Sequence, residues 1–222
     1  MGLGPMPRNC LIGQAAVFLV LLSALVLGTA AGGAGAVSDP AFDDFERGTL
    51  GSNWVVYNGD VGIINKSDLG VLSRSSRLLG LGILAWNATV FRADQFSQAR
   101  ISVDADRNVV IQVFVRRRQS DNQRYGFHWR LHDGGGRWEI KRDGAPNAPV
   151  LASVPGPSPA PGDTIRVEVA GSTITGFRNG VRVLTTTDSM LTEPGQPGIV
   201  LNVYWVTRFP VPAVESWTGG SL

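Results

Sequence analysis

The residues best suited to chemistry lie on three segments in which apolar and polar side chains alternate, 109–118, 124–131 and 198–206. Period-two alternation places every second side chain on one face of a strand. If these strands are neighbours, one face carries Gln112, Arg116, His128 and Tyr204. Proton abstraction next to a carboxylate needs a base such as His or Tyr, and an Arg or Gln that neutralises the carboxylate. The set therefore has the composition of a lyase site.

Basic residues gather in the same part of the chain. Between residues 116 and 143 there are eight Arg or Lys and four Asp or Glu residues, a local charge of +4. The whole chain of 222 residues holds 20 basic and 18 acidic residues. A balance so near zero gives no general attraction to nucleic acid, so no nucleic-acid partner is expected. The local excess indicates either a solvated sheet face with its turns, or a surface for an acidic ligand such as a uronate-containing or sulfated glycan.

Short strands must position these residues. In the segment 163–187, Ile165, Val167 and Val169 alternate with polar residues, and Asn179-Gly180 supplies the positive backbone angles of a two-residue hairpin turn. Antiparallel strands with one apolar face need a second sheet to cover it. Roughly a dozen such runs predict an all-β fold, a two-sheet antiparallel β-sandwich or jelly roll. The segment 145–161, rich in Pro, Ala and Ser, is predicted to be a connecting loop.

The first 36 residues differ from the rest. Arg8, the apolar run 11–27 and the small residues 34–36 have the form of a secretory signal peptide helix, with cleavage before Val37. We therefore expect a signal peptide over 1–36 and one domain over 37–222, secreted and without stable membrane insertion. An uncleaved anchor, which would leave the domain at the cell surface, is the alternative. The single cysteine, Cys10, precedes the cleavage site, so the domain must rely on its hydrophobic core instead of disulfides.

Short motifs along the domain carry a resemblance to a known superfamily. They include Phe42-Asp43-Asp44-Phe45, Leu50-Gly51-Ser52-Asn53-Trp54, Gly162-Asp163-Thr164-Ile165, Phe177-Arg178-Asn179-Gly180 and Val214-Glu215-Ser216-Trp217. With them the chain resembles the extracellular concanavalin A-like lectin/glucanase superfamily, of the LamG-like jelly-roll kind. The resemblance implies two stacked antiparallel sheets, one of them concave, with the first and last strands adjacent. It also implies carbohydrate as the ligand class.

The resemblance and the polar strand faces together favour binding without catalysis. The expected protein is a secreted, lectin-like domain that binds a polysaccharide or glycan on the concave sheet, with a preference for acidic polysaccharide. Aromatic faces and planar polar groups suit sugar rings and their hydroxyls. The predicted ligand-binding residues are Phe114, Arg116, His128, Arg130, Asn202, Tyr204 and Trp86, the last as an exposed Trp at a strand end. The other tryptophans are predicted to pack in the core.

Other functions stay open. Glycosidases of the superfamily carry a Glu-x-Asp-x-x-Glu motif, and its absence here disfavours a glycoside hydrolase. A polysaccharide lyase would use His128, Tyr204, Arg116 and Gln112, although the motifs of jelly-roll alginate lyases are absent. A structural or adhesive surface protein is the third alternative, and its partner would be a protein.

A structural Ca²⁺ is the one metal that the sequence suggests. Asp43 and Asp44 on the first strand could approach Glu215 on the last, and an all-oxygen ligand set suits Ca²⁺. Solvated acids on an edge strand are the competing interpretation. No other cofactor is expected.

Overall fold

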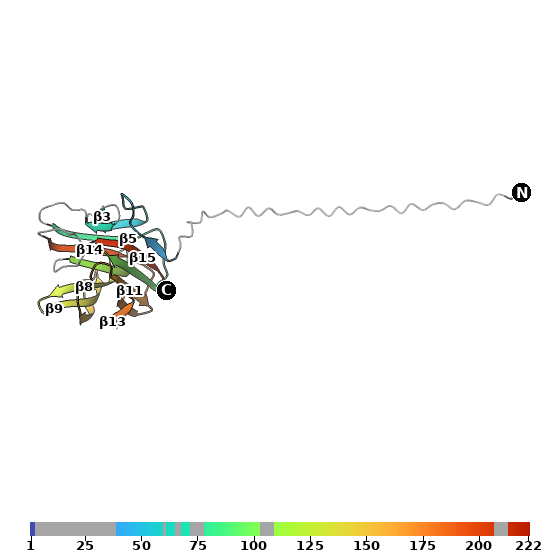
Figure 1. The fold of residues 1–222 in the computed structure, drawn as a ribbon. Helices are drawn as coiled ribbons and strands as arrows, with labels where there is room; N and C mark the ends of the chain where they lie inside the picture. The colour runs from blue at the N-terminus through green and yellow to red at the C-terminus, as the bar shows by residue number, and fades with distance from the viewer. Residues whose placement is uncertain (3–38, 60, 65–67, 72–77, 103–108, 207–212) are drawn as a thin grey trace. The chain divides into compact units, whose positions relative to one another are not determined.

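A computed structural model of the protein describes residues 1–2, 39–59, 61–64, 68–71, 78–102, 109–206 and 213–222, without the side chains of residues 71, 78–80 and 203–206. Within these ranges the chain forms two antiparallel sheets packed face to face and no helix (Figure 1). The predicted all-β sandwich is confirmed. Nearly all of the expected signal peptide lies outside the described residues. The described part contains no apolar helix long enough to cross a membrane.

The eight-stranded sheet is built around the C-terminal strand. Its order is β13, β12, β11, β6, β15, β4 and β3, and β1 also pairs with β15. The strands are β1 (Ala41–Asp43), β3 (Val61–Ile64), β4 (Asp68–Val71), β6 (Gln95–Ile101), β11 (Thr164–Ala170), β12 (Thr173–Arg178), β13 (Val181–Thr187) and β15 (Ala213–Ser221). The first and last strands are therefore adjacent, as the resemblance implies.

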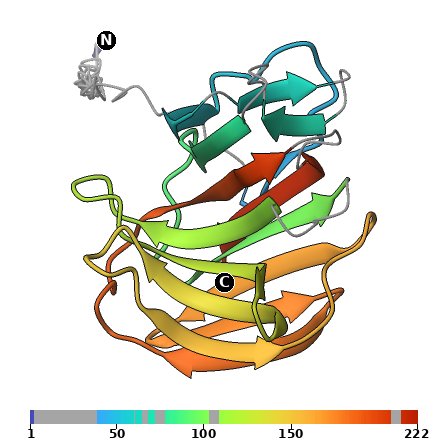
Figure 2. The same ribbon diagram turned by 90° about the vertical axis from the view of Figure 1, so that its left-hand side faces the viewer.

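The seven-stranded sheet covers the apolar face of the other. Its order is β10, β9, β8, β7, β14, β5 and β2, and its long strands lie side by side in Figure 2. The strands are β2 (Trp54–Asn58), β5 (Leu78–Trp86), β7 (Val109–Arg117), β8 (Arg124–His132), β9 (Gly135–Asp143), β10 (Val150–Pro155) and β14 (Gln196–Val206). Because β14 runs antiparallel to β5 and β7, its first residues lie beside the last residues of both strands.

The core between the sheets follows the alternation in the sequence. Ile165, Val167 and Val169 are fully buried in one sheet, and Val113 and Phe127 in the other. The hairpin turn is also as predicted, with φ 51° at Asn179 and 75° at Gly180. Val150–Pro155, in the predicted loop, instead forms strand β10. An edge strand pairs on one side only, and this tolerates the flanking prolines that made the segment look like a loop.

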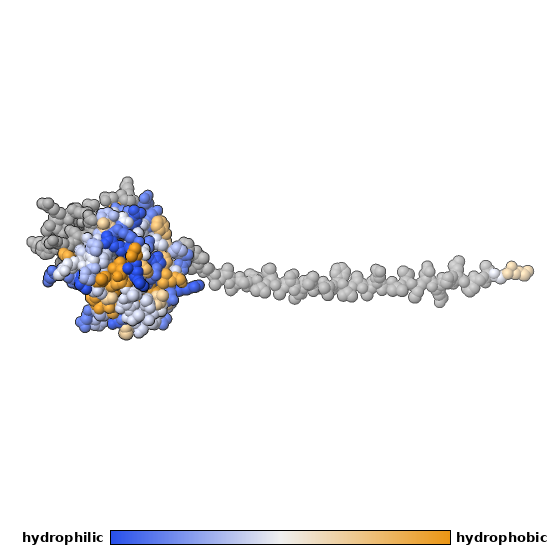
Figure 3. All heavy atoms as spheres, turned by 60° about the horizontal axis from the view of Figure 1, so that its bottom comes forward, coloured by the Kyte–Doolittle hydropathy of each residue, from blue (hydrophilic) through white to orange (hydrophobic). Residues whose placement is uncertain are grey.

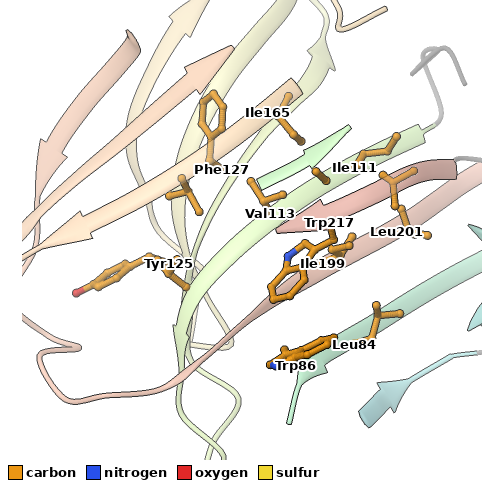
Figure 4. Packing of buried hydrophobic residues seen from close by; sticks show 14 of the residues in the cluster. Leu84, Trp86, Ile111, Val113, Tyr125, Phe127, Ile165, Ile199, Leu201 and Trp217 are labelled. Carbon is orange, nitrogen blue, oxygen red and sulfur yellow. The ribbon is translucent and has the colours of Figure 1, made fainter. Parts of the chain in front are cut away.

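Trp86 lies in this core, so its prediction as an exposed tryptophan is wrong. Its side chain is 3% exposed, its ring stacks on Trp217 at 5.2 Å, and it meets Trp54 edge-on at 5.3 Å. Figure 4 shows Trp86 and Trp217 together at one end of the packed apolar residues. Alternation along β5 turns Leu84 and Trp86 inward and Ile83 and Ala85 outward. Trp86 therefore stabilises the fold and has no surface on which to stack a ligand.

Candidate functional site

Three polar side chains are aligned across the outer face of the seven-stranded sheet, the face turned away from the other sheet. In the register of β7, β8 and β9, Gln112 lies opposite His128, and His128 lies opposite Glu139. Each belongs to the row that alternates with core residues such as Val113, Phe127 and Trp138. Yet Gln112, His128 and Glu139 are only 3–4% exposed. The outer face therefore shelters polar groups, and such groups are stable only when they are hydrogen-bonded.

Gln112 links Asp143 to His128 in a continuous hydrogen-bonded network. Its Nε2 donates to Asp143 Oδ2 at 2.7 Å and lies 3.0 Å from His128 Nδ1. Since an amide nitrogen can only donate, Nδ1 accepts, and the proton of a neutral ring is on Nε2. That Nε2 faces Glu139 Oε2 at 3.5 Å, and Glu139 Oε1 lies 2.8 Å from His132 Nε2. We call Asp143, Gln112, His128, Glu139 and His132 the polar network.

The network keeps Glu139 ionised. Burial by itself raises the pKa of Glu139, but hydrogen bonding and electrostatic interaction with His128 and His132 outweigh burial and lower the pKa below its usual value. A carboxylate with a lowered pKa accepts hydrogen bonds and is a poor proton donor near neutral pH. Glu139 therefore orients two imidazole rings and is not suited to general acid chemistry.

Gly126 allows Gln112 to lie across β8. A Cβ at Gly126 would stand 2.3 Å from Gln112 Nε2 and 2.4 Å from its Cδ. We predict that Gly126→Ala displaces the amide, breaks its bonds to Asp143 and His128, and lowers the free energy of unfolding by about 1–3 kcal/mol. Urea denaturation measures the loss, and the NMR signals of the Gln112 amide report the displacement. Gly134→Ala is the control, since a Cβ there meets nothing within 4 Å. Equal stability of both variants would contradict the prediction.

Arg116 does not join Gln112 on the outer face, and that expectation is wrong. The pairing of β7 with β14 shifts between Phe114 and Arg117, and Arg116 has φ 49°, the signature of a β-bulge. The extra residue turns the side chain of Arg116 towards the eight-stranded sheet. The guanidinium donates to the backbone oxygens of Ala93, Gly171 and Leu191. Arg116 is thus a buried structural cation, 2% exposed.

The same bulge brings Arg117 to the outer face. Its guanidinium carbon lies 3.2 Å from the centre of the Tyr57 ring, in a stacked cation–π contact. Nε donates to Asn122 Oδ1 at 2.7 Å, and Nη1 donates to Gln196 Oε1 at 2.9 Å. Gln196 Oε1 also accepts from the Tyr57 hydroxyl at 2.8 Å. Arg117 is therefore fixed in one orientation.

A second arginine, Arg124, lies at the same end of the face. The 118–123 turn joins β7 to β8, so Arg124 at the start of β8 comes close to Arg117. Its guanidinium carbon lies 5.4 Å from the centre of the Phe114 ring, and Nη1 donates to the Asn122 backbone oxygen at 3.1 Å. We call Arg117 and Arg124 the arginine pair.

The arginine pair is buried without a counter-ion. Arg117 and Arg124 are 2% and 7% exposed, and neither forms an ion pair with a carboxylate of the described residues; Arg124 Nε has no hydrogen-bond partner. Burial lowers the pKa of both groups, and Asp143, which acts on Arg124 from beyond ion-pair distance, offsets this in part. Arginine nevertheless stays charged. Two buried cations without an ion-paired carboxylate are costly, and they favour an anion beside them.

The other predicted ligand-binding residues are placed as follows. Phe114 and His128 are buried on the outer face, and Arg130 and Asn202 are half-buried on β8 and β14. Tyr204 belongs to β14, but its side chain lies outside the described residues. A role of these residues in ligand binding stays a prediction. The structure thus brings Gln112, Phe114 and His128 together and separates Arg116 and Trp86 from them.

Sequence reasoning missed the residues that complete the outer face. Glu139 lies between Trp138 and Ile140 in the sequence, and both of these apolar residues are buried in the core. Alternation along this segment could have placed Glu139 and Asp143 on the outer face, beside His128. Arg124 shares the alternating row of His128. Arg117 could not have been placed in this way, because the β-bulge at Arg116 shifts the inward–outward alternation by one residue.

The structure separates one member of the predicted lyase set from the others. His128 has both ring nitrogens facing protein partners, and Arg116 points into the sandwich. The lyase alternative therefore loses Arg116 and a free ring nitrogen on His128, while the Tyr204 side chain lies outside the described residues.

The predicted calcium ligands have other partners. Asp43 contacts Arg47 Nη1 at 2.6 Å and accepts from Trp54 Nε1 at 2.6 Å, and Glu215 contacts Arg100 Nε at 2.6 Å. Asp44 accepts from the Glu46 backbone N–H at 3.1 Å. The part of the chain that the structure describes holds no cluster of three or more His, Cys, Asp or Glu residues that could bind a metal. The residues present do not fit the Ca²⁺ site suggested above.

Comparisons with known structures agree with the architecture. The chain is similar to the carbohydrate binding module CBM66 from Bacillus subtilis, at 16% identity and a TM-score of 0.55 over 76% of this chain and 96% of that one. It is similar to the potassium-bound carbohydrate recognition domain of Emp46p, at 10% identity and a TM-score of 0.61 over 81% and 96%. A prokaryotic β-1,3-1,4-glucanase (lichenase) from a mouse hindgut metagenome aligns at 9% identity and a TM-score of 0.57, over 83% and 100%.

These similarities define the fold. A carbohydrate-binding module, carbohydrate recognition domains and a glucanase share the concanavalin A-like jelly roll, and this chain has that fold. The predicted superfamily resemblance is confirmed at the level of architecture. No protein-family model and no curated protein matches the sequence. Function must therefore be argued from the residues on the outer face.

Proposed function

We propose that this protein is an exported carbohydrate-binding domain whose ligand lies along the outer face of β7, β8 and β9 and which prefers acidic glycans. The observation that carries the proposal is the polar network, a sheltered and mutually oriented set of amide, imidazole and carboxylate groups. Planar polar groups of this kind match the hydroxyls of a sugar ring. The similarity to structures titled as carbohydrate-binding modules and carbohydrate recognition domains supports the ligand class.

Partly exposed residues beside the network are the expected points of contact. Lys141, with 16% of its side chain exposed, and His132, with 39%, lie on opposite sides of Glu139 along the face. Half-buried Arg130 and Arg137 lie opposite one another on β8 and β9. These cationic and imidazole groups can donate to sugar hydroxyls or carboxylates, while the network beneath holds the face rigid. The acidic preference rests on this basic character, and export rests on the leader sequence.

A binding panel tests the proposal. We expect saturable binding of uronate polymers, weaker binding of neutral glucans and galactans, and no release of unsaturated or reducing ends. Lys141→Ala should weaken uronate binding by roughly 10-fold, the effect of one lost charge-assisted hydrogen bond. Calorimetry measures the affinities. Arg182→Ala is the control, since Arg182 is exposed on β13 at the far edge of the other sheet. Absence of binding to every glycan in the panel would contradict the proposal.

Exposed apolar residues give no specific support to an adhesive function. Those among the described residues come from separate elements, such as Phe42 of β1, Val150 of β10 and Val181 of β13. On the face shown in Figure 3, apolar groups are interleaved with hydrophilic ones. Scattered exposed apolar side chains are normal on soluble proteins.

A further inference from the structure

A pocket lies beside the arginine pair, at the end of the seven-stranded sheet. Three adjacent strands meet there, because the start of β14 lies between the ends of β5 and β7. The pocket has a volume of about 260 Å³. Its polar lining comes from Asn87, Thr89, Arg117, Arg118, Gln119 and Gln196. At roughly 30 Å³ for each water molecule, that volume equals about nine waters, room for one sugar ring.

The Arg117 guanidinium is the charged group built into this pocket. Stacking on Tyr57 and hydrogen bonds to Asn122 and Gln196 fix its plane, all through neutral partners. A fixed guanidinium plane presents parallel N–H groups, which suit the two oxygens of a carboxylate. Arg118, also in the lining, is already paired with Asp121. Arg117 is therefore the cation in the lining that can pair with the carboxylate of a ligand.

The neutral polar groups of the pocket can form hydrogen bonds with the hydroxyls of a sugar. Gln196 Nε2 donates to Asn87 Oδ1 at 2.9 Å, so the amides of these two residues are held in a defined orientation. Thr89 and Gln119 add a hydroxyl and another amide. Val90, 93% exposed, forms an apolar part of the lining. A ring with one carboxylate and several hydroxyls complements this lining.

We propose that the pocket at the ends of β5, β7 and β14 binds one carboxylate-bearing sugar residue, whose carboxylate pairs with Arg117. The proposal deepens the proposed function and rests on it, because it makes the pocket a subsite of the glycan-binding face. Arg124 adds a second positive charge near Arg117 at the same end of the sheet. Arg117 is thus the specificity residue that separates a uronate from its neutral ester.

Matched ligands and matched variants test the subsite. The ligands are tri-galacturonate, its fully methyl-esterified form, and a sulfated galactose trimer, measured by calorimetry on the full domain. We expect the free acid to bind at least roughly 10-fold more tightly than the ester. Arg117→Gln should abolish that difference. Val90→Glu, at an exposed position, should abolish it as well, because the new carboxylate occupies Arg117, whereas Val90→Gln should preserve it. The Val90 variants keep the test valid if Arg117→Gln fails to fold.

The outcomes separate this inference from the proposed function. If wild type binds acid and ester equally, if only the sulfated trimer binds, or if Val90→Glu keeps the preference, the carboxylate subsite is wrong while glycan binding stands. If no oligosaccharide or polymer binds, free galacturonate is titrated while the Arg117 Nε–H NMR signal is followed. A shift with galacturonate and none with galactose would support the subsite and overturn the glycan-binding face. No shift would overturn both.

Discussion

Replacing Trp217 with alanine is expected to lower the free energy of unfolding by about 3–5 kcal/mol, the usual cost of removing a buried large aromatic side chain. Trp217 is 1% exposed and lies at the centre of a cluster, stacked on Trp86 at 5.2 Å and edge-on to Trp54 at 4.8 Å. Its Nε1 also donates to Ser97 Oγ at 2.9 Å, which joins β15 to β6 within the core. Alanine would leave a cavity and a hydroxyl without its donor.

Thermal and urea denaturation measure this loss. For a domain of this size about 3–5 kcal/mol corresponds to a drop of about 6–20 °C in Tm. Phe42→Ala is the matched control, because Phe42 is an aromatic residue on the neighbouring strand β1 and is 61% exposed. The control should change Tm by little. A Trp217→Ala protein as stable as the control would show that the cluster does not hold the sheets together.

The fold could be predicted because its signals are local and redundant. Alternation in 163–187 and the Asn179-Gly180 turn each predict the same hairpins, and the structure confirms both. The strand Val150–Pro155 was missed because its backbone pairing comes from β9, while its own composition is that of a loop. Trp86 was wrongly predicted to be exposed, because its position at the end of a strand does not indicate that the rings of Trp54 and Trp217 pack against it.

The residues of the outer face could be predicted only where side chains alternate between inward and outward along a strand without interruption. Gln112, Phe114 and His128 lie on regular parts of β7 and β8, and the structure brings them together. One inserted residue at Arg116 sends that side chain to the opposite face and puts Arg117 in its place. No local signal marks the bulge, since its backbone conformation depends on β14. The position of Arg117 on the outer face therefore follows from pairing between distant strands.

Asp43→Asn is expected to destabilise the protein by about 3 kcal/mol near neutral pH, the lower end for breaking a buried ion pair because Arg47 is partly exposed. The Asp43 side chain is 5% exposed and the Arg47 side chain 32%. Both terminal nitrogens of Arg47 reach the carboxylate, at 2.6 and 2.7 Å. The same carboxylate accepts from Trp54 Nε1 at 2.6 Å and from the Phe45 N–H at 2.8 Å. An amide offers one acceptor where the carboxylate offers two.

The pH dependence of this effect has a definite sign. Burial raises the pKa of Asp43, but the hydrogen bonds from Arg47, Trp54 and Phe45 and the charge of Arg47 outweigh it, so the folded pKa lies below the unfolded value. The unfolded chain therefore binds the proton more readily, and Asp43 stabilises the fold above the unfolded pKa of about 3.9. This contribution is lost as the pH falls through the folded pKa.

Urea denaturation of wild type and Asp43→Asn at several pH values measures the contribution. The difference in stability should be largest near neutral pH and should shrink below about pH 4, because protonated wild type then resembles the amide. Glu139, whose pKa is also lowered, affects both proteins alike and cancels in the difference. Asp44→Asn, at the next position, should change stability little, since the hydrogen bond that Asp44 accepts from the Glu46 N–H is exposed to solvent. A difference that stays constant down to pH 2 would mean that the ion pair with Arg47 does not stabilise the start of the sandwich.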